Sequence, residues 1–163
     1  MIVVSDTSPV NYLILIDRIA LLPDLLGDVI IPTAVFRELQ AERTPVIVRE
    51  FIFAMPSWMS VRTATLISDI DDDRVDAGER EAILLAEEMA ADALLIDDLA
   101  GREAALDRGL LVIGTVGILK RAAEKGLIDF GAELRKLKSL GFRMSADLEN
   151  EFLKSLENNP GNA

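Results

Sequence analysis

The sequence contains no cysteine and no histidine. The first absence excludes disulfide bonds and thiolate metal sites, and the second removes the commonest general base and the commonest ligand of transition metals. The chain also lacks the basic flank and apolar core of a signal peptide, and no apolar run approaches the roughly 18 residues that cross a bilayer. We therefore expect a cytoplasmic protein with no membrane association, in which any catalysis depends on carboxylates.

Positive charge is scarce and unevenly distributed. The chain has 17 basic and 28 acidic side chains, which gives a formal net charge of −11 at pH 7. This excess of acid argues against a broad surface that binds nucleic acid irrespective of its sequence. Residues 101–143, however, hold nine basic and five acidic side chains. We expect the basic side chains of this segment to steer a nucleic-acid backbone toward the protein.

Short apolar runs alternate with segments of helical periodicity along most of the chain. The runs predict strands at residues 2–4, 28–32, 58–64, 93–98 and 110–114. The segments between them predict helices at residues 33–42, 45–56, 78–91, 99–109 and 115–126, and either one buried helix or two short ones at residues 8–22. This alternation predicts an α/β fold of Rossmann-like type, with α/β/α layers and a parallel sheet of four or five strands. The length suits a single domain over residues 1–157, in which 130–157 form a C-terminal helical extension, and a disordered tail is expected at 158–163.

The first predicted strand ends in the sequence VSDTSPV, which places an acid, two hydroxyls and a proline close together. Asp6 or Thr7 could cap the following helix, because a side-chain oxygen accepts the unpaired backbone N–H groups there and Pro9 suits the first turn. Alternatively, Asp6 is the first ligand of a site at the carboxyl ends of parallel strands, where open α/β sheets bind their ligands. The motif alone leaves both interpretations open.

Four further acids are predicted to converge on Asp6. Asp97 and Asp98 follow the fourth predicted strand, Glu79 begins the helix before that strand, and Glu38 lies on the helix after the second strand. Right-handed crossovers place the carboxyl ends of all the strands at one edge of the sheet, so these acids meet there. Carboxylates without histidine, cysteine or lysine favour Mg²⁺ or Mn²⁺, and such ions activate water and stabilise charge during displacement at a phosphodiester.

A second group of acids, in the run SDIDDDRVDAG at residues 68–78, is another candidate for a metal site. Consecutive acids point in different directions, however, and the run lacks the spaced oxygens and the glycine of a calcium-binding loop. We expect a flexible, solvated loop there.

Three stretches of the chain together resemble the PIN domain, specifically its compact prokaryotic branch of VapC-like proteins. They are VSDTSPVNYLILID, IPTAVFREL and DAGEREAILLAEEMAADALLIDDLAGREAALDRGLLVIGTVGILKRAAEKGLI, and the resemblance covers roughly residues 2–128. It implies a PIN-like fold and a metal-dependent endoribonuclease that uses Mg²⁺ or Mn²⁺. It also implies the toxin of a toxin–antitoxin pair, a homodimer and a small antitoxin partner.

The resemblance also implies roles for individual residues. Its catalytic acids match Asp6, Glu38, Glu79 and Asp98, and all four would bind metal. Asp97 is an additional acid counted with the metal ligands, although Ile96 stands where common PIN toxins have threonine or serine, which leaves the role of Asp97 open. Neighbours that could substitute for Glu79 are Asp76 and Glu81. Small hydroxyl positions beside the first acid match Thr7 and Ser8, and Asn11 lies one helical turn beyond.

The candidate substrate-binding residues are Ser8, Asn11, Arg102 and Thr115. Arg102 lies one turn into the helix after Asp98 and could bind a phosphate through two parallel hydrogen bonds, or pair with a nearby acid instead. Thr115 begins the helix after the fifth strand and could equally be a cap. We expect the homodimer to form through the helices of residues 8–56, because half of the residues are hydrophobic and exposed apolar helix faces need cover.

Two other functions stay open at this point. A PIN-like scaffold could bind metal or a protein partner without cleaving RNA, which the negative net charge makes plausible. A phosphatase of haloacid-dehalogenase type would also place an aspartate after the first strand, but it needs a second aspartate two residues later, where this chain has Ser8.

Overall fold

The computed structural model describes residues 1–158, which divide into two compact units. The first unit is Met1–Thr115 and contains every strand, and the second begins at Val116. The single domain over residues 1–157 stays a prediction. Of the tail expected at 158–163, all but Asn158 lies outside the described residues.

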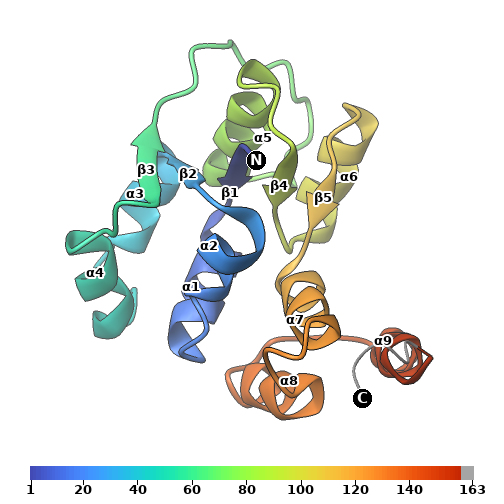
Figure 1. Cartoon of the computed structure of the whole chain (residues 1–163). Helices are drawn as coiled ribbons and strands as arrows, with labels where there is room; N and C mark the ends of the chain where they lie inside the picture. The colour runs from blue at the N-terminus through green and yellow to red at the C-terminus, as the bar shows by residue number, and fades with distance from the viewer. Residues whose placement is uncertain (159–163) are drawn as a thin grey trace. The chain divides into compact units, whose positions relative to one another are not determined.

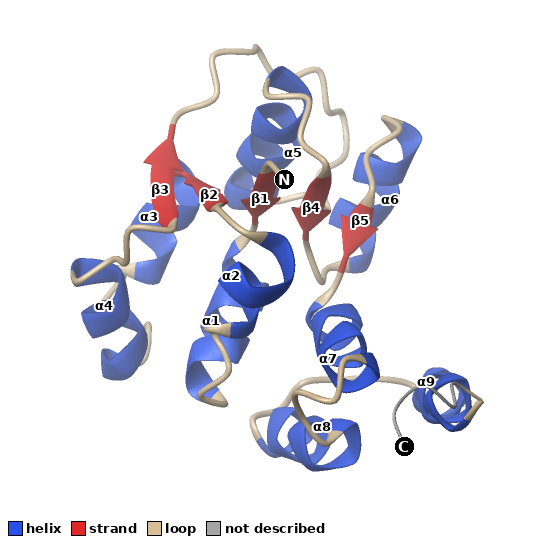
Figure 2. Cartoon of the chain, viewed as in Figure 1, coloured by secondary structure: helices blue, strands red, loops and turns tan. Residues whose placement is uncertain are grey.

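Five strands form one parallel sheet in the first unit (Figure 2). They are β1 (Val3–Ser5), β2 (Val29–Pro32), β3 (Met59–Arg62), β4 (Ala93–Leu95) and β5 (Val112–Ile113). Their order is β3-β2-β1-β4-β5, and all four pairings are parallel. The predicted α/β fold with a parallel sheet is therefore confirmed, and β1 lies at the centre, where the chain reverses its direction of winding.

Helices connect and flank these strands (Figure 1). The helices are α1 (Thr7–Leu15), α2 (Leu21–Leu26), α3 (Thr33–Leu39), α4 (Val46–Phe53), α5 (Ala77–Glu88), α6 (Leu99–Asp107), α7 (Thr115–Glu124), α8 (Phe130–Ser139) and α9 (Ala146–Glu157). Residues 8–22 contribute to two helices, which is one of the two predicted alternatives, because the chain turns at Asp17, whose φ is +58°. No helix within residues 1–158 is both long enough and apolar enough to span a bilayer.

Successive side chains of the central strands point to opposite faces of the sheet, and both faces are buried. Val4 pairs in register with Ile30 and Leu94, and all three belong to a cluster with the buried residues of α5 and α6. Ile31 and Met59 belong to a second cluster with α1, α3 and α4. Burial on both faces is typical of a parallel sheet, whose strands are apolar throughout.

Helix α5 is more deeply buried than an amphipathic helix. Ala82, Ile83 and Ala86 lie at helical spacing and are all buried, but Leu84 and Leu85 are buried as well. The helix contacts β1, β2 and β4, so it crosses the middle of the sheet. This position places the first turn of α5 beside the carboxyl ends of the central strands.

The second unit is small and helical over its described residues, 116–158. Phe130 of α8 and Phe152 of α9 stack with their ring centroids 6.1 Å apart, and the Lys120 ammonium lies 5.9 Å from the centre of the Phe152 ring. Lys138 pairs with Glu149 at 2.8 Å. These contacts join α7, α8 and α9 to one another.

Candidate functional site

Five carboxylates from four helices share one electrostatic environment at the carboxyl edge of the sheet. Asp6 precedes α1, Glu38 lies on α3, Asp76 and Glu79 begin α5, and Asp98 precedes α6. The charges of Glu79, Asp76 and Glu38 raise the pKa of Asp6, and those of Asp76, Asp98 and Glu38 raise the pKa of Glu79. We call these five residues the acidic cluster. It contains all four predicted catalytic acids.

Asp6 is nearly inaccessible to solvent, with 5% of its surface exposed. It occupies the N-cap position of α1, but its side chain makes no capping hydrogen bond to the helix. Its backbone N–H donates to the carbonyl of Leu95, at 2.8 Å, which ties it to β4. Burial raises the pKa of Asp6 well above its usual value, although the Thr7 amide partly opposes this shift. The interpretation of Asp6 as a helix cap is therefore wrong.

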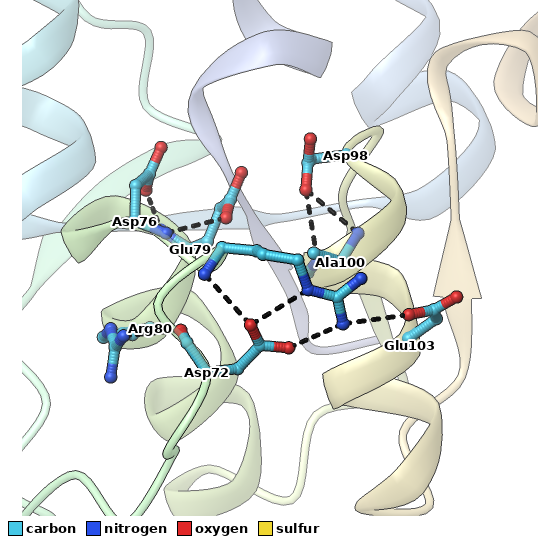
Figure 3. Close-up of polar contacts among 9 residues, drawn as sticks. Asp72, Asp76, Glu79, Arg80, Asp98, Ala100 and Glu103 are labelled. Atoms are coloured by element: carbon cyan, nitrogen blue, oxygen red, sulfur yellow. Dashed lines mark hydrogen bonds and ion pairs between the residues drawn. The ribbon is translucent and has the colours of Figure 1, made fainter.

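Three other acids of the edge, Asp76, Glu79 and Asp98, take part in helix caps. Asp98 Oδ2 accepts the N–H groups of Ala100 and Gly101, at 3.0 and 3.3 Å. Asp76 Oδ1 accepts the Glu79 N–H at 2.8 Å, while Glu79 Oε2 accepts the Asp76 N–H at 3.0 Å, which makes a reciprocal capping box. Figure 3 shows the carboxylates of Asp76, Glu79 and Asp98 pointing to the same side. Backbone N–H groups thus fix one oxygen of each carboxylate.

Glu38 approaches the same place from α3. The Thr7 hydroxyl donates a hydrogen bond to Glu38 Oε2. A Cβ atom added at Gly78 would lie only 2.7 Å from Glu38 Oε1, so the first turn of α5 needs glycine to let this carboxylate in. Gly101 of α6 makes room for an apolar side chain instead, because an added Cβ would lie only 2.6 Å from Ile96 Cδ1.

Asp97 faces away from the acidic cluster. Its Oδ1 accepts the Thr115 N–H at 2.7 Å and its Oδ2 accepts the Thr115 hydroxyl at 2.6 Å. Burial raises the pKa of Asp97, while Thr115 and the charge of Arg102 oppose the rise, and no acid of the cluster contributes to it. The structure therefore does not bring Asp97 together with the other candidate ligands.

The four candidate substrate-binding residues have different surroundings. Ser8 and Asn11 are half-buried on α1, beyond Asp6. Arg102 donates from Nη1 to the Ile96 carbonyl at 3.2 Å. Thr115 is fully buried and engaged with Asp97, so this position gives no support to contact with a substrate.

The acidic loop before α5 is largely exposed to solvent, as predicted, but hydrogen bonds and two buried side chains also hold it against the protein. The Arg80 guanidinium donates to the carbonyls of Ile70, Asp72 and Val75, the last two at 2.6 and 3.0 Å. Asp72 pairs with Arg74 at 2.8 Å (Figure 3). Ile70 and Val75 are buried against α5 and the sheet. The loop therefore packs against the protein and delivers Asp76 to the acidic cluster.

Two acids near Glu79 have roles that the sequence interpretation missed. Asp76 is the N-cap of α5, and the spacing Asp-x-x-Glu is a recognisable capping-box signal that could have identified it. Glu81 instead has a structural role. Its carboxylate accepts hydrogen bonds from the backbone N–H groups of Ala34, at 2.7 Å, and Ala64, at 3.2 Å. It joins α5 to the start of α3 and to the chain after β3.

The chemistry of the acidic cluster fits a hard divalent cation. Across residues 1–158, no three acidic side chains are so arranged that they form a metal-binding group as they stand. The donors are nevertheless all carboxylate oxygens, and burial first, then their mutual repulsion, raises the pKa of both Asp6 and Glu79. A divalent ion relieves such repulsion, and Mg²⁺ and Mn²⁺ prefer these ligands. The acids that would hold it are Asp6, Glu38, Glu79 and Asp98.

Comparison with known proteins agrees with this geometry. The family model of DUF3368, described as a PIN domain, matches residues 2–158. Among solved structures, the fold is similar to that of the PilT N-terminus domain protein SSO1118 from the hyperthermophilic archaeon Sulfolobus solfataricus P2, with a TM-score of 0.56 and 18% sequence identity over 75% of this chain and 93% of that chain. No curated protein sequence matches this chain. The family model spans almost the whole sequence, and the chain therefore belongs to the PIN-domain family.

Proposed function

We propose that the chain is an endoribonuclease that hydrolyses RNA phosphodiester bonds with Mg²⁺ or Mn²⁺, and that it is the toxin of a toxin–antitoxin pair. PIN domains are generally nucleases and typically bind divalent metals. The observation that carries the proposal is the acidic cluster, in which buried Asp6 lies among carboxylates that raise its pKa. A fold that keeps this much negative charge together without paired cations is suited to binding a cation.

Different residues at this site would hold the cation and orient the carboxylates that bind it. When bound, the ion would supply activation of water and stabilisation of the charge that develops on the phosphate. The helix N-termini fix one oxygen each of Asp98 and Glu79 and so orient these carboxylates. The Thr7 hydroxyl orients Glu38 in the same way. The pKa of Glu79, about 7, leaves this carboxyl partly protonated at neutral pH until a cation displaces the proton.

The partners belong to the same proposal. Helix α4 exposes Val46 and Ile47, each 57% exposed, and Phe53, 88% exposed. An apolar face of this kind supports a homodimer formed through the helices of residues 8–56. A small antitoxin that places a basic side chain over the acidic cluster would inhibit cleavage by occupying the position of the cation.

Cleavage of a mixed RNA pool, with Mn²⁺ and with EDTA, tests the proposal. Wild type should cleave only with Mn²⁺, and the metal should raise its melting temperature. The Asp6→Asn variant should melt above wild type without metal, because one repelling charge is gone, and should lose both the Mn²⁺ response and cleavage. Asp73→Asn is the control, since Asp73 is exposed in the loop before α5.

The outcomes separate the possible functions. A rise in melting temperature with Mn²⁺ but no cleavage of RNA would indicate a PIN-like scaffold that binds metal without acting as a nuclease. A full thermal response to Mn²⁺ in Asp6→Asn would show that metal binds elsewhere. Cleavage of a small phosphate ester but not of RNA would indicate a phosphatase, although Ser8 stands where a haloacid-dehalogenase-type enzyme needs its second aspartate.

A further inference from the structure

A surface hollow opens beside Glu38, at the end of α3. Its lining consists of Arg37, Glu38, Ala41, Glu42 and Arg43. The Glu38 carboxylate also accepts from Thr7 and lies against Gly78. Glu38 therefore belongs both to the acidic cluster and to the wall of the hollow, so the hollow begins where the proposed metal site ends.

The two arginines of the hollow are available to a ligand. Backbone carbonyls or carboxylates hold five of the nine arginines in Met1–Thr115: Arg49, Arg74, Arg80, Arg102 and Arg108. Within the described part of the chain, in contrast, the exposed guanidiniums of Arg37, Arg43 and Arg62 take part in no hydrogen bond or ion pair.

Basic side chains of the segment 101–143 are less available than its composition indicates. Lys120 pairs with Glu124 at 3.6 Å, and Lys136 pairs with Glu133 at 3.2 Å. Lys138 pairs with Glu149. The unpaired cations of Met1–Thr115 belong to the same compact unit as the acidic cluster, so we consider these for contact with a polyanion there.

We propose that Arg37 and Arg43 bind a phosphate of the RNA strand next to the phosphate that is cleaved. This inference rests on the proposed function. A guanidinium presents a planar set of donors that matches two phosphate oxygens, and it stays charged at any working pH. In a chain of net charge −11, an RNA strand approaching the acidic cluster meets repulsion, which two cations beside Glu38 offset locally. Glu42 also lines the hollow, but it pairs with neither arginine.

Binding of a short fluorescent single-stranded RNA, followed by anisotropy in EDTA, tests this assignment without cleavage. Arg37→Gln and Arg43→Gln should each weaken binding by about three- to tenfold. Each should also reduce the slope of log K against log salt by about 0.7, the value for one lost phosphate contact on a single strand. Arg62→Gln is the matched control, because Arg62 is an exposed, unpaired arginine at the end of β3, outside the hollow.

The controls distinguish failure of this assignment from failure of the proposed function. Unchanged affinity and slope in both hollow variants, while wild type binds and cleaves RNA, would overturn the assignment alone. An equal loss in Arg62→Gln would also overturn it, since any positive charge at this edge would then suffice. Wild type that binds RNA through the two arginines but never cleaves it would refute the nuclease and keep the binding site. Wild type that does not bind RNA would refute both.

Discussion

Glu79 should make the stability of the fold depend on pH. Its pKa is raised from 4.5 to about 7, first by burial and then by the charges of Asp76, Asp98 and Glu38. The folded protein therefore binds this proton more tightly than the unfolded chain does. Stability is highest when Glu79 is protonated in both states, falls as the pH rises from about 4.5 to about 7, and changes no further above that range.

The size of this effect follows from the shift. A rise from 4.5 to about 7 corresponds to about 3–4 kcal/mol, at about 1.4 kcal/mol for each pKa unit. Screening by water at the edge of the sheet reduces this value, so we expect about 2 kcal/mol. The favourable interaction of a carboxylate with a helix N-terminus is smaller, about 0.3–1 kcal/mol, and does not reverse the sign.

The variant Glu79→Gln isolates the charge. The glutamine oxygen can still accept the Asp76 N–H, so the capping box survives. Urea unfolding in EDTA should show Glu79→Gln more stable than wild type by about 2 kcal/mol at pH 8, and the difference should shrink toward zero as the pH approaches 4.5. Mn²⁺ at a hundredfold excess over Kd should stabilise wild type by about 2.7 kcal/mol, which reverses the order of the two proteins.

Two results would refute this reasoning. One is an unfolding free energy with the same pH dependence in wild type and Glu79→Gln. The other is a variant less stable than wild type at pH 8 without metal, which would mean that the charge of Glu79 stabilises the fold. Glu50→Gln on α4 is the control, since Glu50 is exposed and should leave the pH profile unchanged.

Two further predictions concern the approach of Glu38 and the apolar face of α4. Gly78→Ala places a Cβ atom 2.7 Å from Glu38 Oε1, so it should displace this carboxylate and lower the rate of RNA cleavage at least tenfold while circular dichroism stays unchanged; full activity would show that Glu38 has no part in cleavage. Phe53→Ser should shift the protein from dimer to monomer in light scattering at micromolar concentration. A wild type that is monomeric throughout would contradict the dimer.

Four of the five strands were predictable because each is a short apolar run, whereas β3, with the sequence MSVR, is mostly exposed and carries a weaker signal. The central position of β1 was not predictable, since the order of strands depends on contacts between distant segments that no local pattern records. The turn between α1 and α2 was left open for a different reason, since the sequence allowed either one helix or two short helices over residues 8–22. It depends on Asp17 adopting a positive φ, which aspartate tolerates but does not require.

The right-handed crossover rule predicted that the acids meet at one edge of the sheet. It did not predict which hydrogen bonds each carboxylate makes there. Asp6 and Asp98 both stand between a strand and a helix, yet only Asp98 caps its helix. Asp97 points away from the acidic cluster because both of its carboxylate oxygens accept hydrogen bonds from the N–H and hydroxyl of Thr115. Thr115 lies 18 residues further along the chain. Local sequence places a carboxylate at the edge of a sheet, whereas tertiary contacts decide where its oxygens point.

The burial of Asp6 among other carboxylates has a consequence for protein engineering. A selection for heat resistance in metal-free medium would enrich replacements of Asp6 and Glu79, since each removes a charge that opposes folding. If the proposed function holds, the most thermostable members of such a library would then be the ones that have lost RNA cleavage. Adding Mn²⁺ during the selection would reverse the advantage, because the bound ion stabilises proteins that keep Asp6 and Glu79. The same library would then be enriched in proteins that retain both acids.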